Sequence, residues 1–155
     1  MCVLEFRDVS RGYGGEDVLA GFDRQVHAGE VIGLLGRNGA GKTTLIRLAM
    51  GMLHADRGSV KVFGDDPRRD PVATRRRIGY VAEDQELPPF LKVRDVIAMY
   101  RELYTKWDEA FAADLIERFE LPPDRKVKDL SRGQARQVAL LCAVSHRPDL
   151  LILDE

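Results

Sequence analysis

The chain has 155 residues, which is long enough for one domain with a buried core. Its composition, 45% hydrophobic and 32% charged, is that of a folded globular protein and excludes intrinsic disorder as its general state. The formal net charge is −1, from 24 basic and 25 acidic residues, so charge gives no reason to expect a nucleic-acid partner or an anionic membrane surface.

Two features bear on the compartment. Cys2 and Cys142 are too few and too far apart in sequence for a disulfide framework or a zinc site. The N-terminal residues lack a basic segment followed by an apolar stretch, and no run approaches the roughly 18 apolar residues that span a bilayer. We therefore expect a cytoplasmic chain whose membrane contact, if any, is made through a partner.

Residues 1–82 are rich in short β signals. Segments 3–9, 22–26, 58–64 and 78–82 have the alternation or the apolar content of strands, and a turn is indicated at 28–30. The apolar run 31–35 is typical of a buried parallel strand. A helical pattern then extends from Lys42 to about Met50.

Residues 83–145 change to helical periodicity, with an amphipathic helix predicted over 93–104. Thr105 and Asp108 resemble a capping box that opens a second helix, and Ser131 opens a third. The third helix is expected to bury Val138, Leu141 and Cys142.

The last region, 146–155, contains the apolar run 150–153 followed by Asp154 and Glu155. This pattern predicts a buried strand that carries two carboxylates at its C-terminal end. Ligands bind at that edge in open α/β sheets.

Residues 36–43 fit the pattern G-x-x-x-x-G-K-[ST] in full, between an apolar run and a helix. Glycines at 36, 39 and 41 permit positive φ and close approach of the backbone to phosphate, and the amides from about 39 to 44 are expected to form an anion-binding nest. Lys42 is expected to reach the β- and γ-phosphates, Thr43 to ligate Mg²⁺, and Thr44 to bind the α-phosphate. The predicted nucleotide-binding loop consists of Gly36, Arg37, Asn38, Gly39, Ala40, Gly41, Lys42, Thr43 and Thr44.

Further motifs follow in a recognisable order. Residues 130–134, Leu-Ser-Arg-Gly-Gln, are similar to the signature LSGGQ, and Asp154 closes an apolar strand like that of a Walker B motif. Residues 79–83 match the segment that leads into a Q-loop, and Tyr13 lies upstream in the glycine-rich stretch 11–15. Together these motifs resemble the nucleotide-binding domain of the ATP-binding cassette (ABC) transporters, within the P-loop NTPase superfamily.

The resemblance implies an α/β fold: a P-loop NTPase core with an N-terminal antiparallel β subdomain and an inserted α-helical signature subdomain. We expect one domain over 1–155, made of the core and β subdomain (1–82), the Q-loop and helical subdomain (83–145) and the Walker B strand (146–155). The family continues past Walker B to a switch histidine. His27, His54 and His146 all precede Walker B, so the domain is expected to be incomplete at its C-terminus.

The function implied by the resemblance is hydrolysis of ATP by the subunit that drives a transporter, with ATP and Mg²⁺ as cofactors. Lys42 and Glu155 are the expected catalytic residues, with Glu155 as the base that activates water. Thr43, Asp154 and Glu83 are the expected Mg²⁺ ligands. The residues expected to contact ATP outside the loop are Tyr13, Ser131, Gly133 and Gln134.

This sequence departs from the family pattern at two positions. Arg132 replaces a glycine of the usual signature, and its long cation either strengthens or hinders contact with phosphate. Glu83 stands where glutamine is usual, with Gln85 two residues later. Two matches also have plain structural readings, since S-x-x-Q is itself a capping box and Tyr13 in a glycine-rich turn is compatible with an ordinary surface residue.

The expected partners are a second ABC ATPase subunit and a separate transmembrane permease, which would hold the protein at the inner face of the cell membrane; no nucleic acid is expected. The proline-stiffened segment 87–91 is either the surface that receives the permease or an ordinary linker over the core. The alternatives for the whole chain are a non-transport ABC ATPase and a nucleotide-binding fragment with little or no hydrolysis.

Overall fold

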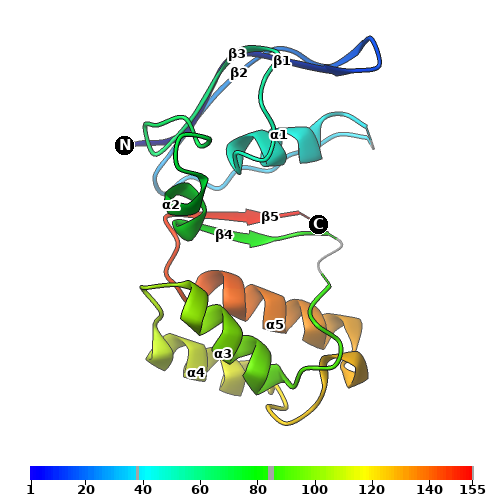
Figure 1. The fold of residues 1–155 in the computed structure, drawn as a ribbon, viewed down its shortest axis with the longest axis vertical. Helices are drawn as coiled ribbons and strands as arrows, with labels where there is room; N and C mark the ends of the chain where they lie inside the picture. Colours follow the sequence, from blue (N-terminus) through cyan, green and yellow to red (C-terminus); the bar gives the residue numbers. More distant parts are fainter. Residues whose placement is uncertain (38, 84–85, 155) are drawn as a thin grey trace. The chain divides into compact units, whose positions relative to one another are not determined.

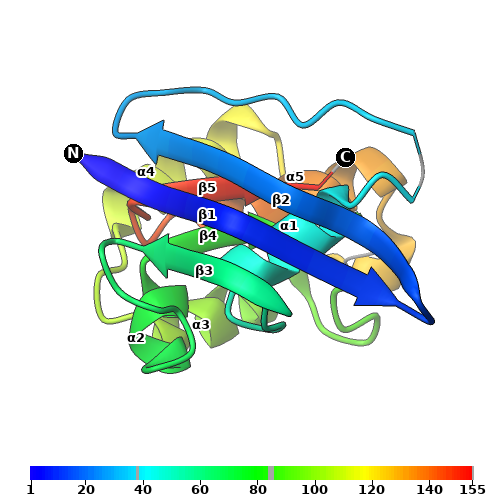
Figure 2. The same ribbon diagram turned by 90° about the horizontal axis from the view of Figure 1, so that it is seen from above.

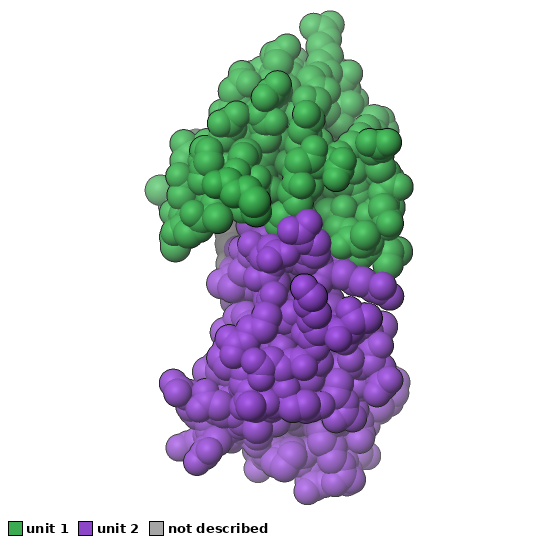
Figure 3. Space-filling model, turned by 90° about the vertical axis from the view of Figure 1, so that its left-hand side faces the viewer, with its two compact units in different colours: residues 1–75 green, residues 76–155 purple. Residues whose placement is uncertain are grey.

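The computed structural model describes residues 1–37, 39–83 and 86–154. The chain forms two compact units, residues 1–75 (unit 1) and residues 76–155 (unit 2), which Figure 3 colours separately. The predicted organisation as one domain in three parts is a statement about the family's domain, and it stays a prediction. In the described part of the chain, no helix has both the length and the apolar character needed to cross a bilayer.

Unit 1 is built on a long hairpin. Strands β1 (Cys2–Tyr13) and β2 (Glu16–His27) are antiparallel and are joined by two glycines, Gly14 and Gly15, with φ of 60° and 91°. A two-residue turn with positive φ at both positions matches the twist of the strands that it joins. Strand β3 (Arg57–Val62) pairs with the other edge of β1, which gives the order β2-β1-β3 (Figure 2). The predicted antiparallel β structure is confirmed.

Helix α1 (Lys42–Ala49) lies on one face of this sheet (Figure 1). Its side chains Leu45, Leu48 and Ala49 are buried, as are Val9 and Val62 on the sheet. Burial of these apolar faces holds helix and sheet together. The helix predicted from Lys42 to about residue 50 is confirmed, and the short helix α2 (Pro71–Arg76) follows β3.

Unit 2 combines a two-stranded parallel sheet with a group of helices. Strands β4 (Ile78–Val81) and β5 (Leu150–Leu153) pair in parallel. The helical elements are α3 (Val93–Leu103), α4 (Glu109–Arg118), the 3₁₀ turn η1 (Val127–Asp129) and α5 (Arg132–Val144), and Figure 1 shows α3, α4 and α5 together on one side of the sheet. The core of this unit consists of Leu87, Val93, Val96, Ala112, Leu121, Val127, Val138, Ala139, Leu141 and Cys142.

Helix α5 confirms the prediction for the third helix. It begins after Ser131 and buries Val138, Leu141 and Cys142 completely. Burial raises the pKa of the Cys142 thiol to about 12. Cys142 is therefore a small core residue and not a reactive thiol.

The strand predicted at 31–35 is wrong for this structure. These residues have no regular secondary structure, and Val31 and Leu35 are each 97% exposed. A strand exists only where a neighbouring backbone supplies hydrogen bonds. Over the described ranges, the segment is not part of any ladder. Its apolar composition indicates a preference for burial but does not supply a partner.

Two smaller expectations also need correction. Strand β5 forms where it was predicted, but it is not fully buried, because Leu151 and Leu153 are 42% and 57% exposed. Helix α4 is not opened by Thr105. Its N-cap is Asp108, whose carboxylate accepts a hydrogen bond from the amide of Phe111 (2.9 Å). Aspartate is itself a strong N-cap, so the helix begins three residues later than the Thr105 pattern indicates.

Candidate functional site: the phosphate loop and the signature helix

The phosphate loop leads into α1, and its N-cap residue makes no side-chain hydrogen bond to the first amides of the helix. The N-cap is Gly41, with φ of 89°, and the first turn contains no capping side chain and no acidic residue. The first amides of any helix have no partner within the helix, and together with the helix dipole they favour an anion. The start of α1 therefore has the geometry of an anion-binding site, and the helix behind it is 8 residues long.

The loop glycines behave in two ways. Gly39 and Gly41 have the predicted positive φ, at 84° and 89°. Gly36 does not, so that part of the prediction is wrong. A Cβ on Gly36 would instead lie 3.0 Å from the Cβ of Ala40, which shows that close approach within the loop is what excludes a side chain there.

Lys42 and Ala40 make contacts inside the loop. The Lys42 Nζ donates a hydrogen bond to the carbonyl of Gly36 (2.9 Å), so its side chain runs back along the loop toward the loop's first residue. The amide of Ala40 donates to the carbonyl of Arg37 (3.0 Å) and so takes part in a turn. The predicted nest from residue 39 to 44 is thus reduced by one amide.

The two threonines differ in exposure. Thr43 is exposed at the start of α1, and Thr44 is buried at 9% exposure. A hydroxyl at an exposed first-turn position is a hard oxygen donor of the kind that Mg²⁺ accepts. The roles predicted for Thr43 in binding metal and for Thr44 in binding the α-phosphate stay predictions, as does the contact of Lys42 with phosphate.

Strand β2 packs against the loop. A Cβ on Gly41 would lie 2.8 Å from the Leu19 side chain and 3.2 Å from that of Val18. Leu19 in turn is opposite Arg11 in the hairpin. The hairpin therefore contacts the phosphate loop directly, so parts of unit 1 that lie far apart in the sequence contribute to one region.

The tip of the hairpin holds Tyr13 in a specific environment. The ring is 46% exposed, and the Arg11 guanidinium lies over it at 4.9 Å from the ring centroid. Asp56 accepts hydrogen bonds from Arg11 Nη1 (2.5 Å) and from the amide of Gly12 (2.9 Å). The pKa of the Asp56 carboxyl is below its ordinary value, first because of the Gly12 amide and then because of Arg11.

Sequence reasoning selected Tyr13 and missed both Arg11 and Asp56. A signal existed for Arg11, because residues i and i+2 of a strand share a face. Asp56 lies 45 residues from Arg11 in the sequence, and no local pattern connects the two.

In unit 2 the ends of β4 and β5 meet at one edge. Val81 pairs with Leu153, and the amide of Asp154 donates to the carbonyl of Val81 (2.9 Å). Asp154 directly follows β5, and the exposed Glu83 lies two residues beyond β4. The expected placement of Asp154 at the C-terminal edge of the sheet is confirmed. Carboxylates are suitable Mg²⁺ ligands, so their chemistry fits the proposed metal role.

The predicted ligands do not form a complete metal cluster by themselves. Among the residues that the structure places, no group of three or more His, Cys, Asp or Glu side chains converges on a common point. Mg²⁺ commonly keeps several waters and binds through one or two carboxylates together with substrate phosphates. The residues present fit that mode, in which ATP itself completes the site.

The signature segment is a closed helix start. The Ser131 hydroxyl accepts a hydrogen bond from the Gln134 amide, and the Gln134 side chain accepts one from the Ser131 amide, each at 3.1 Å. This is the reciprocal capping box that S-x-x-Q predicts. Arg132 and Gly133 are exposed, and a Cβ on Gly133 would meet only the Ser131 hydroxyl, at 3.9 Å. The roles of Ser131, Gly133 and Gln134 in contacting ATP stay predictions.

Three residues considered in the sequence lie outside the described residues. They are Asn38 of the phosphate loop, Gln85 and the expected catalytic base Glu155.

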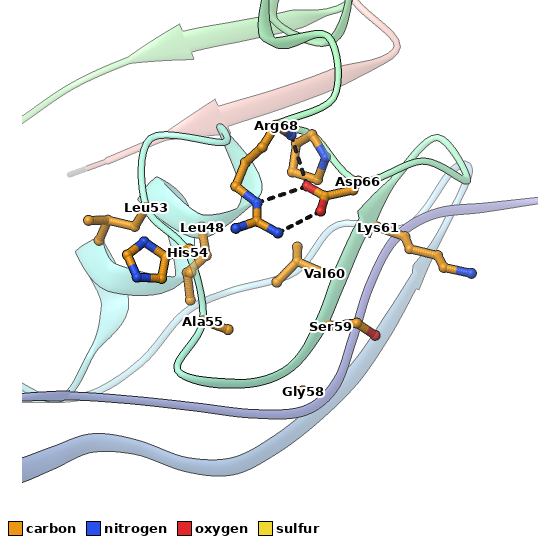
Figure 4. A pocket seen from close by; sticks show the side chains of 11 residues that line it. Leu48, Leu53, His54, Ala55, Gly58, Ser59, Val60, Lys61, Asp66 and Arg68 are labelled. Carbon is orange, nitrogen blue, oxygen red and sulfur yellow. Dashed lines mark hydrogen bonds and ion pairs between the residues drawn. The ribbon is translucent and has the colours of Figure 1, made fainter.

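Two other features of the described residues lie apart from these motifs. His146 is 2% exposed, its ring stacks on Tyr104 at 3.8 Å, and burial lowers its pKa. A cavity of about 140 Å³ in unit 1 is lined by α1, β3 and the segment 53–68 (Figure 4). Its charged wall is the pair between Asp66 and Arg68, and no residue of the predicted site lines it.

A glycine-rich loop opening an uncapped helix, followed by a parallel strand that ends in an acid, defines a nucleotide-binding protein of the P-loop class. The chain belongs to the ABC transporter family, whose model matches residues 19–155.

Known relatives agree with this assignment. The ABC transporter ATP-binding protein YtrB of Bacillus subtilis is 32% identical over 153 residues, which cover 99% of this chain and 52% of YtrB. The Nod factor export ATP-binding protein I of Burkholderia orbicola is 36% identical over 157 residues, covering 98% of this chain and 52% of that protein. The chain thus spans about half the length of these relatives.

Solved structures give the same result. A structure described as the ATP binding subunit of an ABC transporter matches 99% of this chain and 66% of its own, with a TM-score of 0.89 and 30% identity. The structure of cbiO1 from Clostridium perfringens, described as part of the ABC transporter complex cbiONQ, matches with a TM-score of 0.81 and 26% identity, over 99% of this chain and 65% of its own.

Proposed function

We propose that this chain is the nucleotide-binding part of an ABC transporter subunit that binds and hydrolyses ATP to drive transport through a separate membrane permease. The observation that carries the proposal is the start of α1. There a helix with no side-chain cap follows glycines with positive φ, and Lys42 lies along the loop. This arrangement supplies donors and positive charge where a triphosphate needs them.

Each residue has a stated task in the reaction of ATP and water to ADP and phosphate. The amides at the start of α1 and Lys42 bind and neutralise the triphosphate, and Tyr13 stacks on adenine. Thr43, Asp154 and Glu83 are the residues that would hold Mg²⁺, which when bound neutralises charge on the β- and γ-phosphates. Glu155, next to Asp154 in the sequence, orients and deprotonates the attacking water.

The signature segment acts in a dimer of two such subunits. Ser131, Gly133 and Gln134 contact the γ-phosphate of ATP held by the opposite subunit, and closure of the dimer on ATP is the step that moves the permease. The Ser131 oxygen accepts the bond from Gln134, but its O–H remains a donor. The capping box and a phosphate contact are therefore compatible.

The permease partner is supported by an exposed apolar side chain beside the helices of unit 2. Phe90 is 72% exposed between Pro89 and Leu91. The relatives' names refer to ABC transport and, for Nod factor, to export. We propose that the segment 87–91 receives the permease, and that this contact holds the protein at the cytoplasmic face of the membrane.

Calorimetric titration of the intact protein with ATP, with and without Mg²⁺, tests the proposal. We expect binding that depends on Mg²⁺, and we expect Lys42→Ala to weaken it about tenfold or more, because hydrogen bonds to charged groups contribute roughly 1.5–3 kcal/mol each. Lys61→Ala is the matched control, since Lys61 is an exposed lysine on β3 of the same unit.

The outcome that contradicts the proposal is also clear. A folded protein with no magnesium-dependent affinity for ATP, or equal affinity in the Lys42→Ala and Lys61→Ala variants, would exclude the phosphate loop as the nucleotide site.

A further inference from the structure

We propose that Arg11, held by Asp56, is a positioning residue for the nucleotide base: it covers one face of the Tyr13 ring and leaves the opposite face for adenine. The inference rests on the proposed function, because a base reaches Tyr13 only if the phosphate loop holds the triphosphate. It extends that function by assigning two residues that no motif identifies.

The contact between Arg11 and Tyr13 is a cation–π interaction that restricts the orientation of the Tyr13 ring. The guanidinium lies 4.9 Å from the ring centroid, inside the roughly 6 Å range of a cation–π interaction. The Arg11 side chain is only 16% exposed, whereas Tyr13 is 46% exposed. One face of the ring is therefore covered while the ring as a whole stays accessible, as a stacking platform requires.

Asp56 prevents Arg11 from turning away. Its two carboxylate oxygens accept from Arg11 Nη1 and from the Gly12 amide, and its own amide donates to the carbonyl of Ser10 (2.9 Å). Three bonds to three consecutive residues of β1 fix the carboxylate relative to the strand. Because a charge-assisted bond is stronger than a neutral one, Arg11 is held in the position that covers Tyr13.

The hairpin brings this group to the phosphate loop. Arg11 is paired with Leu19 across the hairpin, and Leu19 contacts Gly41 at the start of α1. Figures 1 and 2 both show the tip of the hairpin and the start of α1 toward the same end of unit 1. A ligand with phosphates at α1 therefore has its base directed to the region of Tyr13.

A purely stabilising role accounts poorly for one detail. In the described part of the chain, Arg11 Nε is buried and has no hydrogen-bond partner. A buried unsatisfied donor costs free energy, so this placement of Arg11 is not the one that stability alone would favour. Covering Tyr13 supplies the missing reason.

The test separates the base from the phosphates. Calorimetry on the intact protein measures the affinity for ATP and for inorganic tripolyphosphate, which carries phosphates without a base. We expect Arg11→Ala to weaken ATP binding about three- to thirtyfold, the range of a cation–π contact and the ring order that it maintains. We expect tripolyphosphate binding to change less than about twofold.

Four further variants sharpen the result. Arg11→Gln keeps a hydrogen bond to Asp56 without the charge, and we expect it to lose ATP affinity as Arg11→Ala does, so the test survives if the alanine variant is unstable. Asp56→Ala is expected to show the same selective loss, with no added loss in the double variant with Arg11→Ala. Arg7→Ala, which removes an ion-paired arginine elsewhere on β1, is the matched control and is expected to change neither affinity.

Two outcomes overturn the inference alone. One is unchanged ATP affinity in both Arg11 variants, and the other is an equal loss of affinity for ATP and tripolyphosphate, which would show a general structural role. If the unaltered protein binds neither ligand, the proposed function fails and the inference fails with it.

Discussion

The two helices that begin in predicted nucleotide-binding motifs, α1 and α5, start in opposite ways. Helix α1 starts at Gly41 with no side-chain cap and no acidic residue in its first turn. Helix α5 starts at Ser131, where the side chains of Ser131 and Gln134 satisfy each other's backbone amides. Both helices begin within a glycine-containing motif, but only α5 has side chains that cap its first amides.

This difference separates a helix whose N-cap has no side-chain acceptor from a helix in which side chains cap two of the first amides. Every helix has four amides at its start that require acceptors. In α5 side chains supply acceptors for two of these amides, those of Ser131 and Gln134, and Arg132 and Gly133 are exposed. In α1 the N-cap Gly41 supplies no side-chain acceptor, and an anion such as a phosphate is a suitable acceptor for first-turn amides. We therefore expect α1 to respond to nucleotide and to backbone changes more strongly than α5.

The largest expected effect is at Gly41. The substitution Gly41→Ala places a side chain at φ of 89° and within 2.8 Å of Leu19, and we expect a loss of about 2–3 kcal/mol in the free energy of unfolding together with weaker ATP binding. Urea denaturation with and without ATP measures both. Gly29→Ala is the control, because it has φ of 85° but nothing within 4 Å. Equal losses at the two positions would contradict the role of the Leu19 contact.

A pH-dependent effect is expected at His146, which lies just beyond the C-terminal end of α5. Folding buries the His146 ring and lowers its pKa, so the unfolded state binds more protons and stability falls as the pH drops below the ordinary histidine pKa. One proton limits the loss to about 1.4 kcal/mol per pH unit. Urea midpoints at pH 7.5 and 5.5 measure it. His146→Phe keeps the stack on Tyr104 and should remove most of this difference; an unchanged pH dependence would contradict the assignment.

The smallest expected effect is at the capping box of α5. We expect Ser131→Ala to cost about 1 kcal/mol, because the first turn loses an acceptor. In contrast, Gly133→Ala adds a methyl group on a helix in ordinary contact with the Ser131 hydroxyl, at 3.9 Å, and it should be neutral or stabilise by about 0.5–1 kcal/mol. Thermal unfolding of the two variants checks this pair. A larger loss from Gly133→Ala than from Ser131→Ala would break the comparison between α1 and α5.

Local sequence patterns predicted several helices, strands and caps of this fold. The cap at Ser131 and Gln134, the helix from Lys42 and the strand that ends before Asp154 each depend on residues within a few positions of one another. Such signals arise from hydrogen bonds and side-chain direction within one element, and these depend on residue types at fixed spacings in the sequence. Even so, the predicted N-cap Thr105 is wrong, because the nearby Asp108 is an equally good N-cap residue and takes that position.

Features that depend on residues far apart in the sequence could not be predicted from local patterns. The run 31–35 is as apolar as a buried strand, yet whether it pairs depends on backbone elsewhere in the chain. The exposure of Leu151 and Leu153 depends likewise on what lies beside β5. The hydrogen bond between Arg11 and Asp56 joins strand β1 to the residue that precedes β3, 45 residues later. The sequence pattern predicts the chemistry of the site, and the tertiary contacts around it came from the structure.

One close approach in unit 1 limits which sequences this fold can tolerate. A Cβ on Gly58 would overlap the backbone oxygens of Arg7 and Asp8, and Gly58 itself has φ of 79°. Gly58 lies two residues after Asp56, at the start of β3. In a saturation mutagenesis screen selected for function, this position should accept no other amino acid, because any replacement would shift β3 and move Asp56 with it. A residue far from the phosphate loop in sequence would then be as intolerant of change as the loop itself.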